Sequence, residues 1–62
     1  MLEPLLTIDA TCGVLAVSRQ TLYRLVRAGE LHPTRVGERM RFRPGDLRAY
    51  VDRHREPSFP RD

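Results

Sequence analysis

The sequence predicts a small α+β domain made of two short helices, a β-hairpin and a third helix. A chain of 62 residues can bury one thin core and has no room for a deep catalytic cavity. Residues 18–29 have the apolar periodicity of an amphipathic helix, and residues 34–42 have the shorter period of paired strands. We expect an extended segment at residues 1–6, a folded domain at residues 7–55 and a flexible tail at residues 56–62.

The central helix of this domain is expected between Ser18 and Gly29. Ser18 suits the N-cap because its hydroxyl accepts from an otherwise unpaired backbone N–H, and Gly29 suits the left-handed residue that follows a helix. At about 100° per residue, apolar side chains gather on one face and polar ones on the other. The apolar face holds Leu22, Leu25 and Val26, and the polar face holds Arg19, Gln20, Tyr23, Arg24 and Arg27.

The polar face of this helix has no acidic residue to balance its three arginines. A merely solvated face is the alternative interpretation, but a face of that kind usually alternates acids with bases four residues apart. Like charges at this spacing repel each other unless a polyanion relieves the repulsion. The face therefore favours a nucleic acid as the partner.

Positive charge is concentrated in the middle of the chain. Residues 19–55 contain ten arginines and four acids, which leaves +6, whereas the whole chain carries +3. This concentration is typical of a phosphate-binding surface. The single cysteine, Cys12, cannot form an internal disulfide and is expected in the core. Since no stretch resembles a membrane span or a secretory leader, we expect a cytoplasmic protein with no membrane partner.

A first helix is expected from Ile8 to Leu15, with Thr7 as its N-cap. Ile8, Cys12 and Leu15 fall on one face, and Thr11 lies at the edge of that face. This face is expected to pack on the apolar face of the next helix.

Only Ala16 and Val17 separate this helix from Ser18, so the chain must reverse direction in a tight turn. This is the spacing of a helix-turn-helix unit, in which the N-terminal residues of the second helix reach base edges in the major groove. Arginine can bond guanine bidentately and glutamine can bond adenine, so the residue types fit direct readout of duplex DNA. The predicted base-edge residues are Arg19, Gln20, Tyr23 and Arg24.

A β-hairpin is expected from two short strands with Gly37-Glu38-Arg39 between them. One of its faces is apolar and should pack on the helices, while the other is lined with arginine. A charged strand edge that only prevents aggregation is the alternative interpretation. The apolar face is expected to hold Val36, Met40 and Phe42, and the outer face Arg39, Arg41 and Arg43.

A last helix is expected to begin at Pro44, with Asp46 near its positive end. It should close the core against the hairpin through an apolar stripe of Leu47, Tyr50, Val51 and His54. Beyond it, Phe59 of the tail could dock on its own domain or on a partner, and the sequence does not choose between these.

Several of these segments follow one another in an order that resembles a known family. They are Leu6-Thr7-Ile8, residues 17–26, Arg35-Val36-Gly37, Arg41-Phe42-Arg43-Pro44 and residues 46–50. Together they resemble the excisionase family of MerR-like winged-helix DNA-binding domains over residues 5–54. The resemblance implies a small winged helix-turn-helix whose second helix sits in the major groove and whose hairpin is a wing in the adjacent minor groove.

The polar helix face and the resemblance together give the candidate DNA-binding residues. These are Ser18, Arg19, Gln20, Tyr23, Arg24, Arg27, Arg39 and Arg41. The chain departs from the family at Ala10, where an acid is common, and at Ala16, where the interhelical turn usually has glycine. Both departures bear on the stability of the first helix and lie away from the candidate DNA face.

The resemblance also implies a function and partners. A bacteriophage excisionase, or recombination directionality factor, binds attachment-site DNA together with neighbouring copies of itself, bends the DNA and directs a tyrosine integrase toward excision. A small MerR-like transcriptional regulator that binds operator DNA is the alternative. Because such regulators usually append a dimerisation helix or an effector domain, the end of this chain at Asp62 favours the excisionase.

Two other classes of function find less support. An RNA-binding protein would be expected to have more aromatic side chains for base stacking. An enzyme or a zinc protein would need ligating or nucleophilic residues in a suitable spacing, and His32 and His54 have none to Cys12. We therefore expect no catalytic residue, no metal and no cofactor.

Overall fold

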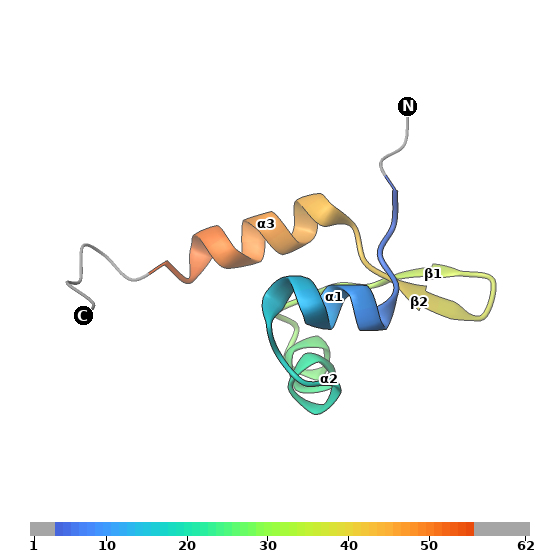
Figure 1. The fold of residues 1–62 in the computed structure, drawn as a ribbon, viewed down its shortest axis with the longest axis horizontal. Helices are drawn as coiled ribbons and strands as arrows, with labels where there is room; N and C mark the ends of the chain where they lie inside the picture. The colour runs from blue at the N-terminus through green and yellow to red at the C-terminus, as the bar shows by residue number, and fades with distance from the viewer. Residues whose placement is uncertain (1–3, 56–62) are drawn as a thin grey trace.

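The computed structural model describes residues 4–55 and has the predicted α+β winged helix-turn-helix fold (Figure 1). Two helices form the helix-turn-helix pair, two strands form the wing, and a third helix follows. In order, the elements are α1 (Ile8–Leu15), α2 (Arg19–Arg27), β1 (Thr34–Val36), β2 (Arg39–Arg41) and α3 (Pro44–Arg53). The predicted tail at residues 56–62, with Phe59, lies outside the described residues.

Helices α1 and α2 begin at the predicted N-caps. Thr7 Oγ1 accepts a hydrogen bond from the backbone N–H of Ala10 at 3.1 Å. Ser18 Oγ accepts one from the backbone N–H of Thr21 at 3.2 Å. Each bond satisfies a donor that has no partner within the helix. Gly29, just after α2, has the predicted left-handed backbone with a φ of +80°.

The turn between α1 and α2 depends on a left-handed alanine. Ala16 has φ 59° and ψ 45°, and its N–H bonds back to the carbonyl of Cys12. The N–H of Val17 donates to the same carbonyl at 3.0 Å. A Cβ in this conformation approaches the following carbonyl, which costs about 1–2 kcal/mol. The alanine that replaces the usual glycine therefore leaves strain in the turn.

The wing closes through a two-residue turn of Gly37 and Glu38, because Val36 pairs directly with Arg39. Gly37 has a φ of +63°, as the first central residue of a type II′ turn requires. Arg39, which we expected in the connection, is the first residue of β2. Strand β2 therefore begins one residue earlier than the sequence predicted.

This shorter turn places Val36 on the opposite face of the wing from Met40. Side chains alternate between faces along a strand, and directly paired residues share a face. Val36 therefore lies on the face of Arg39 and Arg41, and it is 49% exposed. The prediction that Val36 packs with Met40 and Phe42 is wrong for Val36, whereas the other two do pack in the core.

The core lies where the helix pair, the base of the wing and the start of α3 meet. Phe42 is fully buried directly after β2 and makes two backbone hydrogen bonds with Leu6, at 2.8 and 2.9 Å. This bridge ties the segment before α1 to the base of the wing. Leu31, in the connector after α2, is a buried residue that the periodicity did not indicate. The buried apolar residues are Leu22, Leu31, Phe42 and Leu47.

Thr11, which we predicted at the edge of α1's apolar face, is fully buried. Its hydroxyl oxygen has no hydrogen-bond partner among the described residues. A buried hydroxyl in this state destabilises a fold by about 1–3 kcal/mol. The methyl group of Thr11 therefore stabilises the fold by packing, whereas its unpaired hydroxyl destabilises it.

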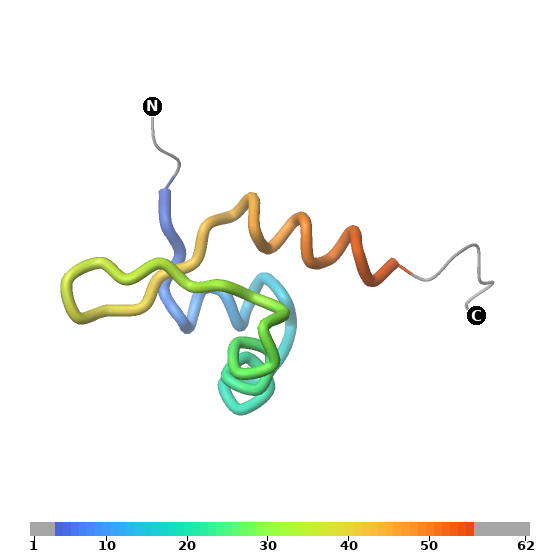
Figure 2. Tube along the Cα trace, turned by 180° about the vertical axis from the view of Figure 1, so that it is seen from behind, coloured from blue at the N-terminus to red at the C-terminus, as the bar shows by residue number. Residues whose placement is uncertain are grey.

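Helix α3 begins at Pro44 as predicted, and it packs on the core through Leu47 and Tyr50. The expected stripe is wrong for Val51 and His54, since Val51 is 48% exposed and His54 is also exposed. Val51 borders an open groove whose wall also includes Leu6 and Val14, and His54 pairs with Glu30 in the connector after α2. Figures 1 and 2 show α3 and the wing projecting to opposite sides of the molecule.

Candidate nucleic-acid interface

The predicted polar side chains of α2 lie at the surface. Gln20, Arg24 and Arg27 are exposed, and Tyr23 is half-buried. Within residues 4–55, Arg24 and Arg27 take part in no ion pair. Two positive charges on one helix face are therefore open to an anionic partner.

Ser18 is engaged at the start of α2. Besides accepting from the backbone of Thr21, its hydroxyl donates to Thr21 Oγ1 at 3.2 Å. These bonds hold the backbone of the first turn of α2, which carries Arg19 and Gln20. In the free protein, Ser18 therefore helps to hold Arg19 and Gln20 in position.

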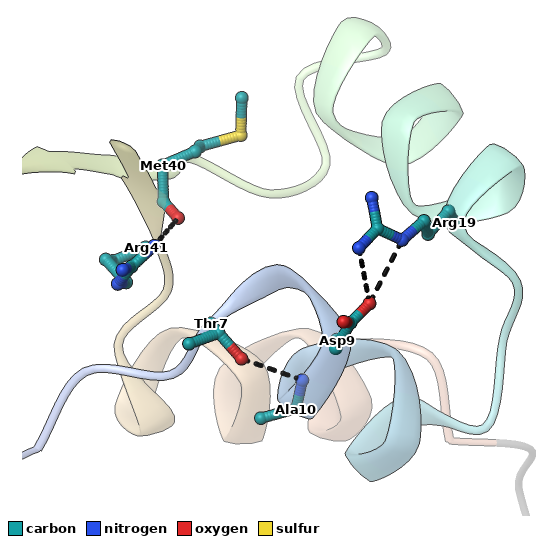
Figure 3. A network of polar contacts seen from close by, with 6 residues as sticks. All are labelled: Thr7, Asp9, Ala10, Arg19, Met40 and Arg41. Atoms are coloured by element: carbon teal, nitrogen blue, oxygen red, sulfur yellow. Dashed lines mark hydrogen bonds and ion pairs between the residues drawn. The ribbon is translucent and has the colours of Figure 1, made fainter. Parts of the chain in front are cut away.

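Arg19 is held by an acid of the other helix. Its Nε and Nη2 both donate to Oδ1 of Asp9 in α1, at 3.0 and 2.6 Å (Figure 3). The hydrogen bond and the charge of Asp9 raise the pKa of Arg19 further above its already high value. The sequence showed no acid within α2, and it could not show this pair because the two residues meet only through the packing of α1 on α2.

The two wing candidates lie on one face but in different environments. Arg39 is exposed, whereas Arg41 is half-buried and its Nη1 donates to the carbonyl of Met40 at 3.0 Å. Arg35 pairs with Met40 and lies on the opposite face of the wing. The outer face of the wing therefore presents two arginines, with Val36 beside them.

A cleft of about 540 Å³ lies between the helix pair and the wing. It brings together three candidate residues from two distant parts of the chain, Arg19 with Arg39 and Arg41. It also includes Arg35 and Glu38, which we did not predict as site residues. The other candidates on α2 are not part of its wall. The complete lining is Thr7, Ile8, Asp9, Arg19, Arg35, Glu38, Arg39, Met40 and Arg41.

A second polar cluster joins the connector after α2 to the end of α3. Glu30 Oε1 lies 3.1 Å from His54 Nε2 and 3.8 Å from Arg53 Nη2, and the latter atom also donates to the Glu30 carbonyl at 3.1 Å. The rings of Tyr50 and His54 lie 4.4 Å apart between their centroids. The cluster holds the projecting half of α3 against the connector and uses a histidine that the sequence had placed in an apolar stripe.

Neither a metal centre nor a membrane-spanning helix is found in the part of the chain that the structure describes. No three His, Cys, Asp or Glu side chains of residues 4–55 lie close enough together to hold a metal ion. No helix among these residues has the length and apolar character needed to cross a bilayer.

Comparison with known proteins gives a family match and three relatives. A family model described as a helix-turn-helix domain matches residues 5–55. Uncharacterized proteins of Mycobacterium bovis and of two strains of Mycobacterium tuberculosis are each 37% identical to the chain over 54 residues. The match covers 87% of this chain and 47% of each relative, so the chain spans about half of their length. No solved structure gives a significant match.

Proposed function

Because the chain belongs to the helix-turn-helix domain family, we propose that it binds duplex DNA with α2 in the major groove and the wing in the adjacent minor groove. The observation that carries this proposal is the pair of exposed arginines on α2, Arg24 and Arg27, which have no acidic partner among residues 4–55. An isolated positive face of this kind attracts the phosphate backbone, and its helix has the width that a major groove admits.

The candidate residues divide into two roles. Gln20 and Arg24 are exposed near the start and middle of α2 and suit base edges, because both side chains bond bases bidentately. Arg27, near the end of the helix, and Arg39, on the wing, suit phosphates. Tyr23 lies half-buried between these positions and supplies a hydroxyl and an apolar ring edge.

The finer proposal is an excisionase. In this role several copies of the chain load on adjacent sites of a phage attachment region, bend the DNA and recruit a tyrosine integrase for excision. The resemblance of residues 5–54 to the excisionase family supports it, and so does the wing, whose two arginines on one face suit a narrowed minor groove. A cytoplasmic location on bacterial DNA is part of the same proposal.

A specific observation favours a second candidate, a transcriptional regulator. The mycobacterial relatives are about twice as long as this chain, so a region similar to it occurs there beside a further segment of comparable length. A regulator that binds operator DNA with this domain would place its dimerisation or effector function in such a segment.

The test is a gel-shift titration on the attachment region of the element that encodes the chain, beside a scrambled duplex of equal length, at two salt concentrations. We expect tighter and stepwise binding on the native duplex, with an affinity that falls as salt rises. For arginine variants of α2 and the wing, Arg48→Ala is the matched control, since Arg48 is an exposed arginine on α3 that lies outside the cleft and α2.

A recombination assay then separates the two candidates. An excisionase must increase the yield of excised product from paired attachment sites in the presence of the integrase. If the chain binds the region but leaves the yield unchanged, the excisionase proposal is wrong and the regulator remains. If the chain binds neither duplex, the DNA-binding proposal itself is wrong.

A further inference from the structure

The pair of Asp9 and Arg19 uses only part of the arginine's bonding capacity. A guanidinium has five N–H donors, of which Asp9 Oδ1 takes one from Nε and one from Nη2. Figure 3 shows Nη1 pointing away from Asp9. The edge formed by Nη1 and Nη2 therefore keeps its parallel donors, which is the fork that a bidentate acceptor requires.

Stability of the free protein does not account for this pair. The side chains of Arg19 and Asp9 are 58% and 76% exposed, and exposed ion pairs contribute little because water screens their charges. The pair does, however, restrict the orientation of a long side chain that would otherwise sample many rotamers. The ion pair therefore acts by fixing the orientation of the Arg19 side chain.

The position of Asp9 also places a negative charge inside the proposed interface. Asp9 lines the cleft together with four arginines, so its carboxylate opposes the attraction of that cleft for phosphates. Glu38 on the wing turn lines the same cleft but makes no ion pair among the described residues. Asp9 and Glu38 therefore both reduce the positive charge of the cleft, but of these two only Asp9 binds an arginine.

We propose that Asp9 is a positioning residue that fixes the guanidinium of Arg19 for bidentate bonding to guanine, and so gives the domain discrimination among sequences while lowering its affinity for duplex DNA in general. This inference rests on the proposed DNA-binding function. A freely moving arginine satisfies its charge on any phosphate within reach, whereas a guanidinium held along one edge presents the other in a fixed direction. Guanine O6 and N7 are the base-edge acceptors that match such a fork.

The test selects binding sequences from a random duplex pool with the wild-type chain, Asp9→Ala, Arg19→Ala and Glu38→Gln. The position that loses its guanine preference in Arg19→Ala identifies the base that Arg19 contacts. We expect Asp9→Ala, which removes the acceptor of both Arg19 hydrogen bonds, to reduce the preference at that same position from about tenfold to about threefold or less. We also expect its affinity for a scrambled duplex to rise by about two- to fivefold, because one negative charge is gone.

Glu38→Gln is the matched control, because it removes the same charge from the same cleft without touching Arg19. It should raise the affinity for scrambled DNA to a similar extent and leave every base preference unchanged. Partial unfolding of a variant would lower the active fraction on all sequences equally, so a loss at one position cannot come from instability. Circular dichroism of each variant gives the folded fraction directly.

Three results would overturn the inference, and they differ in what they say about the proposed function. If Asp9→Ala keeps the preference at the Arg19 position, Asp9 acts only through its charge and the domain still binds DNA as proposed. If the wild-type chain binds all duplexes alike, DNA binding stands but there is no discrimination for Asp9 to support. If the wild-type chain enriches and binds no duplex at all, the DNA-binding proposal fails and the inference fails with it.

Discussion

Val36 and Arg39 lie directly opposite each other across the wing, and this pairing puts an apolar side chain on the arginine face of the hairpin. The register follows from the turn, because a glycine with positive φ at position 37 closes the two strands in two residues. The wing therefore contributes Met40 to the core and little else, since β1 has no buried side chain. Its stability depends on the base of the hairpin.

The first prediction follows from this register. Val36→Thr keeps a β-branched side chain on an exposed face, so we expect the free energy of unfolding to change by less than about 0.5 kcal/mol. Phe42→Ala should lose about 3–5 kcal/mol, because it empties a fully buried site, and this loss would unfold a domain of this size. Thermal unfolding followed by circular dichroism measures both. A loss above about 1.5 kcal/mol for Val36→Thr would contradict the register.

The second prediction concerns the strained turn between α1 and α2. Ala16→Gly should stabilise the domain by about 1 kcal/mol, because glycine adopts the left-handed backbone of this position without a steric penalty. For a domain of this size the midpoint Tm should rise by about 4–8 °C. Ala28→Gly is the control, since Ala28 has an ordinary right-handed backbone and the same change there should destabilise. A lower Tm for Ala16→Gly would show that the turn is not strained.

The third prediction concerns the buried hydroxyl of Thr11. Thr11→Val replaces a hydroxyl that has no partner with a methyl group of similar size, so we expect a gain of about 1 kcal/mol in the free energy of unfolding. Thr11→Ser keeps the hydroxyl and removes the methyl group, and it should destabilise. Urea denaturation of both variants measures the difference. Equal stability of Thr11→Val and the wild type would mean that water or a neighbouring group satisfies the hydroxyl in solution.

The fourth prediction tests base readout by α2. Arg24→Ala should weaken binding to the preferred DNA site by about 1–3 kcal/mol and relax the base preference there. The reason is that Arg24 is exposed on the polar face and has no ion pair within residues 4–55. Titration against the preferred and a scrambled duplex gives both quantities. An equal loss on the two duplexes would reduce Arg24 to a phosphate contact.

The fifth prediction tests the wing. Arg41→Ala should weaken binding to every duplex to a similar extent and lower the slope of log affinity against log salt by about one, as expected for one lost phosphate contact. Arg48→Ala on α3 should leave the slope unchanged. If Arg41→Ala also leaves it unchanged, the half-buried guanidinium of Arg41 serves the hairpin and not the DNA.

Features that depend only on residues close together in the sequence were predictable. The caps at Thr7 and Ser18 and the left-handed Gly29 follow from local backbone chemistry, and the helices begin where these residues require. The hairpin register was less predictable, because moving the turn by one residue reverses every side chain. The alternation of apolar and polar residues around Val36 is compatible with a two-residue turn as well as with the predicted three-residue connection.

Features that depend on how elements meet were not predictable. Leu31 lies in a connector without periodicity and is buried in one cluster with Leu22, Phe42 and Leu47 from other parts of the fold. Val51 has the spacing of a core residue, yet it borders an open groove beside α1 and stays 48% exposed. The pair of Asp9 and Arg19 joins two helices whose relative angle no sequence pattern gives.

The backbone bridge between Leu6 and Phe42 also bears on the order in which the chain can fold. Leu6 and Phe42 lie far apart in the sequence, whereas the hydrogen bonds of α1 and α2 join residues only a few positions apart. Closing a long loop costs more chain entropy than forming a local turn, and helices form faster than distant strand pairs. The helices can therefore form early in folding, whereas the core around Phe42 is completed only when the segment before α1 reaches the base of the wing.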